Sequence, residues 1–267
     1  MGLWLFFLNK KAHMSTDPAA PILQMRAVRK SFAGFIAVRN LDLDVQRGTI
    51  HALIGPNGAG KTTVFNLATK FHQPTAGQIF FKGIDITATS PSAVARLGMV
   101  RSFQISAVFA SLSALENVRI ALQRFRGDSF AFWRNEKVLN VLNDQARDLL
   151  DQVGLDDVRD RTAGELPYGR RRALELATTL ALDPELLLLD EPMAGMGHED
   201  VERIAKLIRR VAAHRTVLMV EHNLSVVADL SDHITVLARG EILAQGSYTQ
   251  VSRDPAVIEA YVGTDHD

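Results

Sequence analysis

The sequence contains no cysteine among its 267 residues. Structural disulfides and thiolate metal sites are therefore excluded, and a reducing compartment is compatible with the composition. No apolar run approaches the roughly 20 residues that a membrane-spanning helix needs. An excess of charge of one sign is also absent, because 30 basic side chains balance 30 acidic ones. The bulk charge gives no indication of a nucleic-acid partner, and we expect none.

What is present describes an ordinary globular chain. Hydrophobic residues make up 47% of the sequence and charged residues 22%. A chain of this length can bury a large core, either as one domain or as a domain with an inserted lobe.

The amino terminus opens with an apolar run at residues 2–8. No basic residue precedes the run and no small-residue cleavage site follows it, so it does not match a signal peptide. Met14 is itself a possible start. We predict a disordered or misassigned leader over residues 1–20, with a loose membrane-surface contact as the alternative, and one folded domain over residues 21–267.

Hydrophobic periodicity predicts alternating strands and helices along the domain. The predicted strands are residues 22–27, 41–45, 50–54, 78–81, 186–189, 216–220, 234–237 and 241–244. The predicted helices are residues 60–70, 91–97, 169–181 and 201–211. Such alternation favours an α/β sheet with helices on both faces.

The middle of the chain has a different pattern. Residues 114–153 are helical in period, and one apolar stripe contains Val138, Leu142, Ala146, Leu149 and Leu150. We interpret this stretch as part of a helical lobe of about residues 105–180, inserted between strands of the sheet.

Residues 55–63 read GPNGAGKTT directly after an apolar strand, and they fit the G-x-x-x-x-G-K-[ST] pattern of the P-loop. In this loop glycines let backbone N–H groups surround a phosphate, and the next helix directs its positive end at the same phosphates. Lys61 would reach the β and γ phosphates, Thr62 would bind Mg²⁺, and Thr63 would lie near the α and β phosphates. The alternative is a chance glycine-rich turn. The other predicted nucleotide contacts in the loop are Gly55, Asn57, Gly58, Ala59 and Gly60.

A second run, LLLLDE at residues 186–191, ends a buried strand in two carboxylates. Open α/β sheets bind ligands at the carboxyl ends of their strands. Asp190 can hold Mg²⁺ through water, and Glu191 is suited to polarise the attacking water. The alternative is a strand that ends in solvated acidic residues.

The chain resembles the ATP-binding subunits of ABC transporters over about residues 21–263. The resemblance depends on five motifs in order: GPNGAGKTT, then RSFQ at residues 101–104, LPYGR at 166–170, LLLLDEP at 186–192, and Glu221-His222. It implies an α/β P-loop ATPase core with an antiparallel β subdomain and an inserted helical subdomain. It also implies ATP and Mg²⁺ as cofactors.

The resemblance assigns further roles. Gln104 would sense Mg²⁺ and contact the membrane subunit, and His222 would bond the γ phosphate. Phe32 would stack on adenine, although a core phenylalanine is the rival interpretation and Phe35 lies nearby. The signature residues that would face the ATP of the opposite subunit are Tyr168, Gly169 and Arg170.

Within the family, the motifs and the carboxyl-terminal sequence IEAYVG at residues 258–263 are similar to the branched-chain amino-acid uptake branch, which importers of urea and other small solutes share. The implied partners are transmembrane permease subunits, a second ATP-binding subunit in a heterodimer and, indirectly, a periplasmic or extracellular solute-binding protein. The implied location is the cytoplasmic face of the cell membrane.

Two departures from the family pattern stand out. Pro167 replaces the usual signature serine, and Arg170 replaces a glutamine. Gly197 replaces the usual terminal Asp or Asn of the D-loop. The arginines at positions 170–172 are open to two interpretations, a contact to phosphate or to a partner, or a solvated helix face.

Two other functions compete with a transport ATPase. A soluble ABC-type ATPase that acts on ribosomes or DNA usually carries two cassettes or a long coiled coil, whereas this chain shows one cassette and no heptads. A non-catalytic nucleotide switch is disfavoured by the residues Lys61, Asp190, Glu191 and His222.

Overall fold

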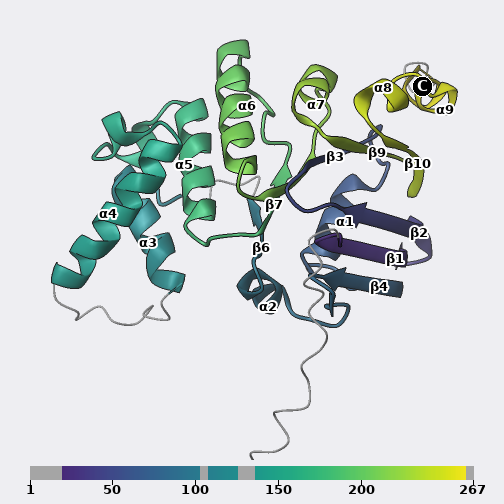
Figure 1. Cartoon of the computed structure of the whole chain (residues 1–267), viewed down its shortest axis with the longest axis horizontal. Helices are drawn as coiled ribbons and strands as arrows, with labels where there is room; N and C mark the ends of the chain where they lie inside the picture. The colour runs from purple at the N-terminus through teal and green to yellow at the C-terminus, as the bar shows by residue number, and fades with distance from the viewer. Residues whose placement is uncertain (1–19, 103–107, 126–135, 263–267) are drawn as a thin grey trace, which may run out of the picture. The chain divides into compact units, whose positions relative to one another are not determined.

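The computed structural model describes residues 20–102, 108–125 and 136–262 (Figure 1). The chain divides into two compact units. The first comprises residues 1–94 and 231–267, and the second comprises residues 95–230. The predicted leader falls almost entirely on residues 1–19, outside the described residues, and the predicted domain boundaries remain predictions.

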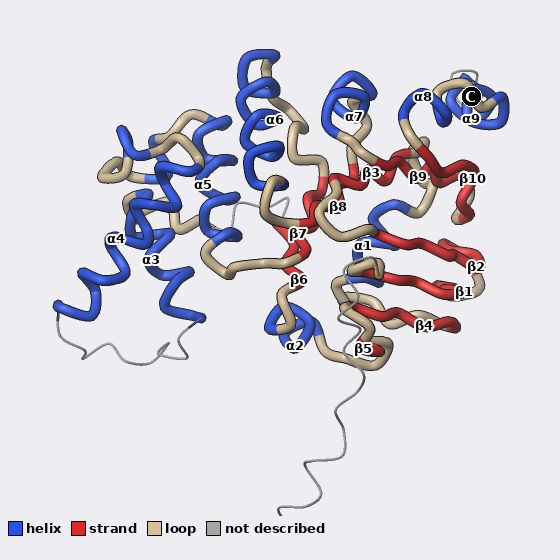
Figure 2. The backbone as a smooth tube through the Cα atoms, viewed as in Figure 1, coloured by secondary structure: helices blue, strands red, loops and turns tan. Residues whose placement is uncertain are grey.

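The first unit contains an antiparallel sheet. Its strands are β1 (Leu23–Phe32), β2 (Phe35–Val45), β4 (Ala76–Phe81) and β5 (Ile84–Asp85). They pair in the order β2-β1-β4-β5, and Figure 2 shows them in this succession. Leu23, Met25, Leu41, Leu43 and Val45 alternate with polar residues and are buried, as period-two patterning requires. Both hairpin strands run further toward their turn than predicted, because ladder pairing continues through residues of which most are exposed or half-buried.

The same unit contains a second group of strands. β3 (Ile50–Ile54) runs parallel to β9 (His233–Ala238), and β9 pairs antiparallel with β10 (Glu241–Gly246). Every residue of β3 is buried, as expected for a parallel strand that is apolar except for His51. The helices of this unit are α1 (Lys61–Ala68), α8 (Tyr248–Val251) and α9 (Pro255–Val262). Figure 1 shows α8 and α9, in yellow, beside β10.

The second unit contains a parallel group of strands. Its members are β6 (Met99–Ser102), β7 (Leu186–Asp190) and β8 (Thr216–Val220), with β7 paired to both of the others. The four leucines of β7 are at most 2% exposed, as expected for a parallel strand covered on both faces. β6 was not predicted, since four residues carry too little periodic signal. The short helix α2 (Pro91–Arg96) lies where the division between the units falls.

Three helices of the second unit pack together: α3 (Ala114–Phe125), α4 (Glu136–Gln152) and α5 (Tyr168–Leu180) (Figure 1). Of the predicted stripe, Leu142, Ala146 and Leu150 are buried and Leu149 is half-buried, whereas Val138 lies outside the described side chains. A capping box starts α3, in which the Ser113 hydroxyl accepts from the Glu116 N–H at 3.2 Å and the Glu116 carboxylate accepts from the Ser113 N–H at 2.8 Å. Two short 3₁₀ turns, at Asp156–Val158 and Ala163–Glu165, lie between α4 and α5.

Two more helices complete the second unit, α6 (His198–Ala212) and α7 (Leu224–Leu230). α6 buries Ile204, Leu207, Ile208 and Val211 on one face, as its 3.6-residue period predicts. Its first turn carries acidic residues and its last turn basic ones, which suits the helix dipole. Among the helices in the described ranges, none combines the length and the apolar character needed to cross a bilayer.

Candidate nucleotide site

The glycine loop joins β3 to α1 in the first unit. Gly55, Gly58 and Gly60 have φ angles of 146°, 76° and 102°, values that favour glycine. A Cβ on Gly55 would lie 2.1 Å from the carbonyl oxygen of Leu237, and one on Gly60 would lie 2.7 Å from that of Ala37. A Cβ on Gly58 would meet nothing within 4 Å. Gly55 and Gly60 therefore allow neighbouring strands to approach the loop closely. The sequence pattern did not reveal this role.

Lys61 is the first residue of α1 and bends back over the loop. Its Nζ donates to the carbonyl oxygens of Gly55 at 2.6 Å and Pro56 at 2.9 Å. Asn57 and Gly58 at the tip of the loop are exposed. A lysine ammonium at the amino end of a helix, next to an exposed glycine turn, is a donor set that suits a polyphosphate.

The predicted threonines follow the lysine in the first turn of α1. Thr62 is exposed and Thr63 is partly exposed, whereas Ala59 is only 2% exposed. The hydroxyl of Thr62 is thus accessible to a ligand. Ala59 contributes through its backbone, since its carbonyl accepts from Gly240 at 3.0 Å.

Phe32 ends β1 with its ring on the surface. Its side chain is 39% exposed, so it does not lie in the core, and the rival interpretation is wrong. The His72 ring meets it edge-on at a centroid distance of 5.1 Å, and Lys30 Nζ lies 4.8 Å from its centroid. Phe35 is 70% exposed. Phe32 therefore presents a supported aromatic surface, as a base-stacking residue would.

Asp190 ends β7 and is 2% exposed. Its Oδ2 forms a close ion pair with Nη2 of Arg101, which comes from β6. Arg172 donates from Nη2 to the Asp190 carbonyl oxygen at 3.3 Å and pairs with Glu175 at 2.6 Å. A buried charge requires such compensation. Sequence reasoning missed the pairing of Arg101 with Asp190, because 89 residues separate them.

Glu191 follows with an unusual backbone. Its φ is 45°, in the left-handed region that residues other than glycine seldom adopt. The turn is held by hydrogen bonds from the Glu191 N–H to the Val220 carbonyl at 3.0 Å and from the Ala194 N–H to the Glu191 carbonyl at 3.1 Å. Backbone strain of this kind persists only where surrounding structure imposes it, and it gathers at functional positions.

His222 follows β8, and its side chain is 64% exposed. The preceding residue, Glu221, is fully buried. Its Oε2 accepts from the backbone N–H groups of His222 at 2.9 Å and Asn223 at 3.2 Å, and its Oε1 accepts from the Met193 N–H at 3.1 Å. Glu221 thus organises the histidine loop, a role that its place in the motif did not suggest.

The predicted signature begins α5. Pro167 is the N-cap residue of the helix, and the Tyr168 hydroxyl donates to the Ala194 carbonyl at 3.1 Å. A Cβ on Gly169 would lie 2.4 Å from the Asp200 carboxylate, so a larger residue at this position would clash with that carboxylate. Arg170 pairs with Asp157 at 2.8 Å.

The three consecutive arginines have separate internal contacts. Arg171 donates to the Gly164 carbonyl at 3.0 Å. Arg172 is buried, so the interpretation as a solvated helix face is wrong for that residue. Gln104, predicted as a metal and permease contact, lies outside the described residues.

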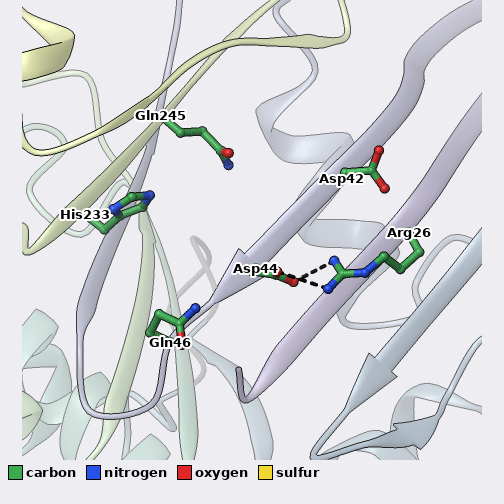
Figure 3. Close-up of a pocket in the computed structure, with 6 residues that line it drawn as sticks. All are labelled: Arg26, Asp42, Asp44, Gln46, His233 and Gln245. Carbon is green, nitrogen blue, oxygen red and sulfur yellow. Dashed lines mark hydrogen bonds and ion pairs between the residues drawn. The ribbon is translucent and has the colours of Figure 1, made fainter. Parts of the chain in front are cut away.

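A polar cavity of about 430 Å³ lies elsewhere in the first unit (Figure 3). Its lining residues are Arg26, Asp42, Asp44, Gln46, His233 and Gln245. Arg26 and Asp44 neutralise one another across it at 2.6 Å. None of the predicted site residues lines this cavity.

A glycine loop between a buried strand and a lysine-headed helix, with an Asp-Glu pair after another buried strand, defines a nucleotide hydrolase of the P-loop class. The model of the ABC transporter family matches residues 38–194, more than half of the chain. The chain therefore belongs to the ABC transporter family, and it is an ATP-binding and ATP-hydrolysing subunit. A second model, the branched-chain amino acid ATP-binding cassette transporter, matches residues 241–267.

Individual relatives agree. The chain is 38% identical over 253 residues to the high-affinity branched-chain amino acid transport ATP-binding protein BraF of Pseudomonas aeruginosa, covering 91% of this chain and 98% of that protein. It is 36% identical over 255 residues to LivG of Escherichia coli, with the same coverage.

Solved structures agree on the fold. A nucleotide-free ATP-binding cassette of an ABC transporter matches with a TM-score of 0.79 and 28% identity, covering 90% of this chain and 98% of that one. The ADP conformation of an ATP-binding cassette matches with a TM-score of 0.81 and 28% identity, covering 92% and 100%. The predicted fold class is confirmed.

Proposed function

We propose that this chain powers an importer of branched-chain amino acids or of a related small solute. The observation that carries the proposal is the match of residues 241–267 to the branched-chain family model. That segment contains β10, α8 and α9, outside the part of the chain that matches the general ABC model. The relatives BraF and LivG, which match along almost their whole length, are named for the same transport.

For nucleotide binding, we propose that Lys61 and the backbone of residues 55–60 hold the phosphates. Lys61 already lies against the loop through two carbonyl contacts, so its charge needs little reorganisation to compensate the β and γ phosphates. Phe32 would stack on adenine, with His72 holding the ring edge-on.

Magnesium fits the chemistry of the residues in place. Mg²⁺ in nucleotide sites is usually held by one or two protein oxygens together with phosphates. Asp190 offers a carboxylate that pairs with Arg101, and Thr62 offers an exposed hydroxyl. When bound, the metal would neutralise charge on the phosphates. Gln104 is proposed as a further contact.

For hydrolysis, we propose that Glu191 polarises the attacking water and that His222 bonds the γ phosphate. The strained turn at Glu191 and the Glu221 contacts fix the backbone of both residues. A general base must be oriented to within hydrogen-bond reach of its water, and a fixed backbone at Glu191 would support that orientation. Tyr168, Gly169 and Arg170 would serve the ATP bound by a second subunit.

The proposed assembly contains this chain, a second and different ATP-binding subunit, and two permease subunits at the cytoplasmic face of the membrane. A solute-binding protein would deliver the cargo from the other side. Closure of the two ATPases on ATP would drive the permease, and hydrolysis would reset it. The chain itself would not touch the cargo.

The test is reconstitution. The chain is co-expressed with the permease and ATPase subunits of its own gene neighbourhood, purified as a complex and placed in liposomes that enclose ATP and Mg²⁺. We expect uptake of labelled leucine, isoleucine or valine when the cognate binding protein is added. Urea, offered in parallel, distinguishes the related substrate class.

Two variants serve as controls. Glu191→Gln should bind ATP normally and abolish turnover, whereas Lys61→Ala should lose most of its ATP affinity. Failure to copurify with any permease would overturn the transport role. Normal hydrolysis by Glu191→Gln would overturn the base assignment and leave the transport role standing.

A further inference from the structure

The carboxylate of Asp190 already has a cationic partner inside the protein. Nη2 of Arg101 contacts Oδ2 of Asp190, and the two side chains are 12% and 2% exposed. Within the described residues, a second guanidinium, that of Arg172, donates to the backbone carbonyl of Asp190 and has Glu175 as its own acidic partner at 2.6 Å. The Arg101 contact therefore compensates the Asp190 charge.

A guanidinium and a divalent cation make conflicting demands on one carboxylate. The Oδ2 lone pair that accepts from Arg101 is not available at full strength to a metal or to its bound water. The two cations also repel one another at close range, and burial weakens the screening of that repulsion. Whatever affinity Asp190 gives to a metal is therefore reduced by Arg101.

We propose that Arg101 competes with Mg²⁺ for Asp190 and so weakens the contribution of the metal to nucleotide binding. This inference rests on the proposed role of Asp190 as a metal contact. In the cycle, Arg101 would yield the carboxylate when Mg²⁺ arrives with ATP and recover it when Mg²⁺ leaves. Asp190 would then never be a buried charge without a partner, and release of the spent nucleotide would be easier.

The competition predicts an effect of distinctive sign, because removing the arginine charge should tighten metal binding. A residue that merely supported Asp190 would give the opposite sign, since its loss would weaken metal binding. A residue with a purely structural role would leave the metal contribution unchanged. The sign of one measurement therefore decides between three possibilities.

The experiment measures ATP dissociation constants by calorimetry with the full chain carrying Glu191→Gln, so that ATP is not consumed. Each variant is titrated once in Mg²⁺ and once in EDTA. The dissociation constant in EDTA divided by the dissociation constant in Mg²⁺ gives the contribution of the metal. We expect Arg101→Gln, which keeps an amide donor for Oδ2 and removes the charge, to raise this ratio about tenfold. Arg101→Lys, which keeps the charge, should leave it near the parent value.

A matched control comes from the same unit. Arg215 is 19% exposed and pairs with Asp183 at 3.1 Å. Arg215→Gln removes an arginine of similar burial together with an ion pair, and it should not change the ratio. Asp190→Asn reports on the carboxylate itself and should lower the ratio.

Thermal unfolding provides a second measurement that needs no tight binding. Loss of the Arg101 charge leaves Asp190 uncompensated, so Arg101→Gln should lower the melting temperature in EDTA. Mg²⁺ with ATP should then raise the melting temperature of this variant by more than that of the parent. If Arg101→Gln does not fold in EDTA, recovery of a folded chain in Mg²⁺ with ATP, but not in EDTA with ATP, gives the same answer.

The outcomes separate this inference from the function it rests on. If Asp190→Asn lowers the ratio and Arg101→Gln does not raise it, the competition is wrong and the metal role of Asp190 stands. If Asp190→Asn leaves the ratio unchanged, the metal role itself is wrong.

Discussion

The carboxylate of Glu221 accepts a hydrogen bond from the backbone N–H of Met193 across 3.1 Å, and so connects the segment after β8 to the segment after β7. The same buried group holds the N–H of His222. One side chain thereby links the proposed histidine switch to the turn that carries Glu191.

Glu221→Gln should lower turnover without preventing ATP binding. The amide nitrogen of glutamine cannot accept a hydrogen bond, so one of the two acceptor atoms of the side chain is lost. A buried backbone N–H is then left unsatisfied, at a cost of about 1–3 kcal/mol. The measurement is the maximal ATPase rate beside the free energy of unfolding in urea. His222→Ala serves as the comparison. Turnover equal to that of the parent would show that Glu221 does not position His222.

Pro167→Ser should raise hydrolysis at the site of the partner subunit. Pro167 is the N-cap of α5 and has neither a hydroxyl nor an N–H to offer. Restoring one donor to a charge that develops in the transition state typically contributes about 3 kcal/mol, on the order of a hundredfold in rate. The assay is ATPase activity of the reconstituted heterodimer.

The control for this prediction is a heterodimer whose other ATPase carries a substituted P-loop lysine. The gain from Pro167→Ser should disappear there. If the gain persists, serine acts on the chain that carries it, for example by capping α5, and the assignment across subunits is wrong.

Gly197→Asp should be more stable than Gly197→Ala by about 1 kcal/mol. Gly197 is the N-cap of α6, with φ −72° and ψ 163° and no side-chain cap, a conformation that any residue can adopt. Aspartate would supply the missing acceptor and favourable charge at the helix amino terminus, and alanine controls for the change in backbone entropy. Urea unfolding measures the difference, and equal stabilities would show that the cap does not form.

The stability of the first unit should fall in mild acid because of His51. Burial, together with the neighbouring His233, lowers the pKa of His51 to about 3. The unfolded chain therefore takes up the proton first, so stability is full above pH 6.5 and is lost as the pH falls from 6.5 toward 3. At pH 5 the loss relative to pH 8 should be about 2 kcal/mol.

His51→Gln isolates this effect. The variant cannot titrate, and it keeps a polar side chain for Thr235 Oγ1, which His51 Nε2 contacts at 2.8 Å. Urea unfolding at pH 8, 6.5 and 5 should show the parent losing more stability than the variant. Parallel losses would mean that other groups govern the acid sensitivity.

The local motifs could be read from the sequence because each is a short run with a fixed backbone form. The phosphate loop, the Asp190-Glu191 pair and the strands at residues 50–54 and 216–220 all fall in that class, and both strands have the predicted bounds. A buried apolar run or a glycine spacing can be recognised from adjacent residues alone.

The contacts that tune the site could not be read in this way. Arg101 meets Asp190 from 89 residues away, and Glu221 meets Met193 from 28. Neither distance follows a period, and neither partner is identified by its residue type. The exposure of Phe32 likewise depends on the residues that pack around it, and the residue type alone does not determine this.

The approach of Leu237 to Gly55 has a consequence for biosynthesis. The first residue of the phosphate loop rests against a carbonyl from a strand that the ribosome makes 182 positions later, and β3 pairs with that same strand. At cellular elongation rates of about 5–20 residues per second, the loop waits roughly 10 to 40 s for this neighbour. During that interval the nascent chain exposes β3, which is apolar except for His51, without its partner β9. Translation pauses before residue 237 and chaperones that shield β3 should therefore govern the yield of active subunit.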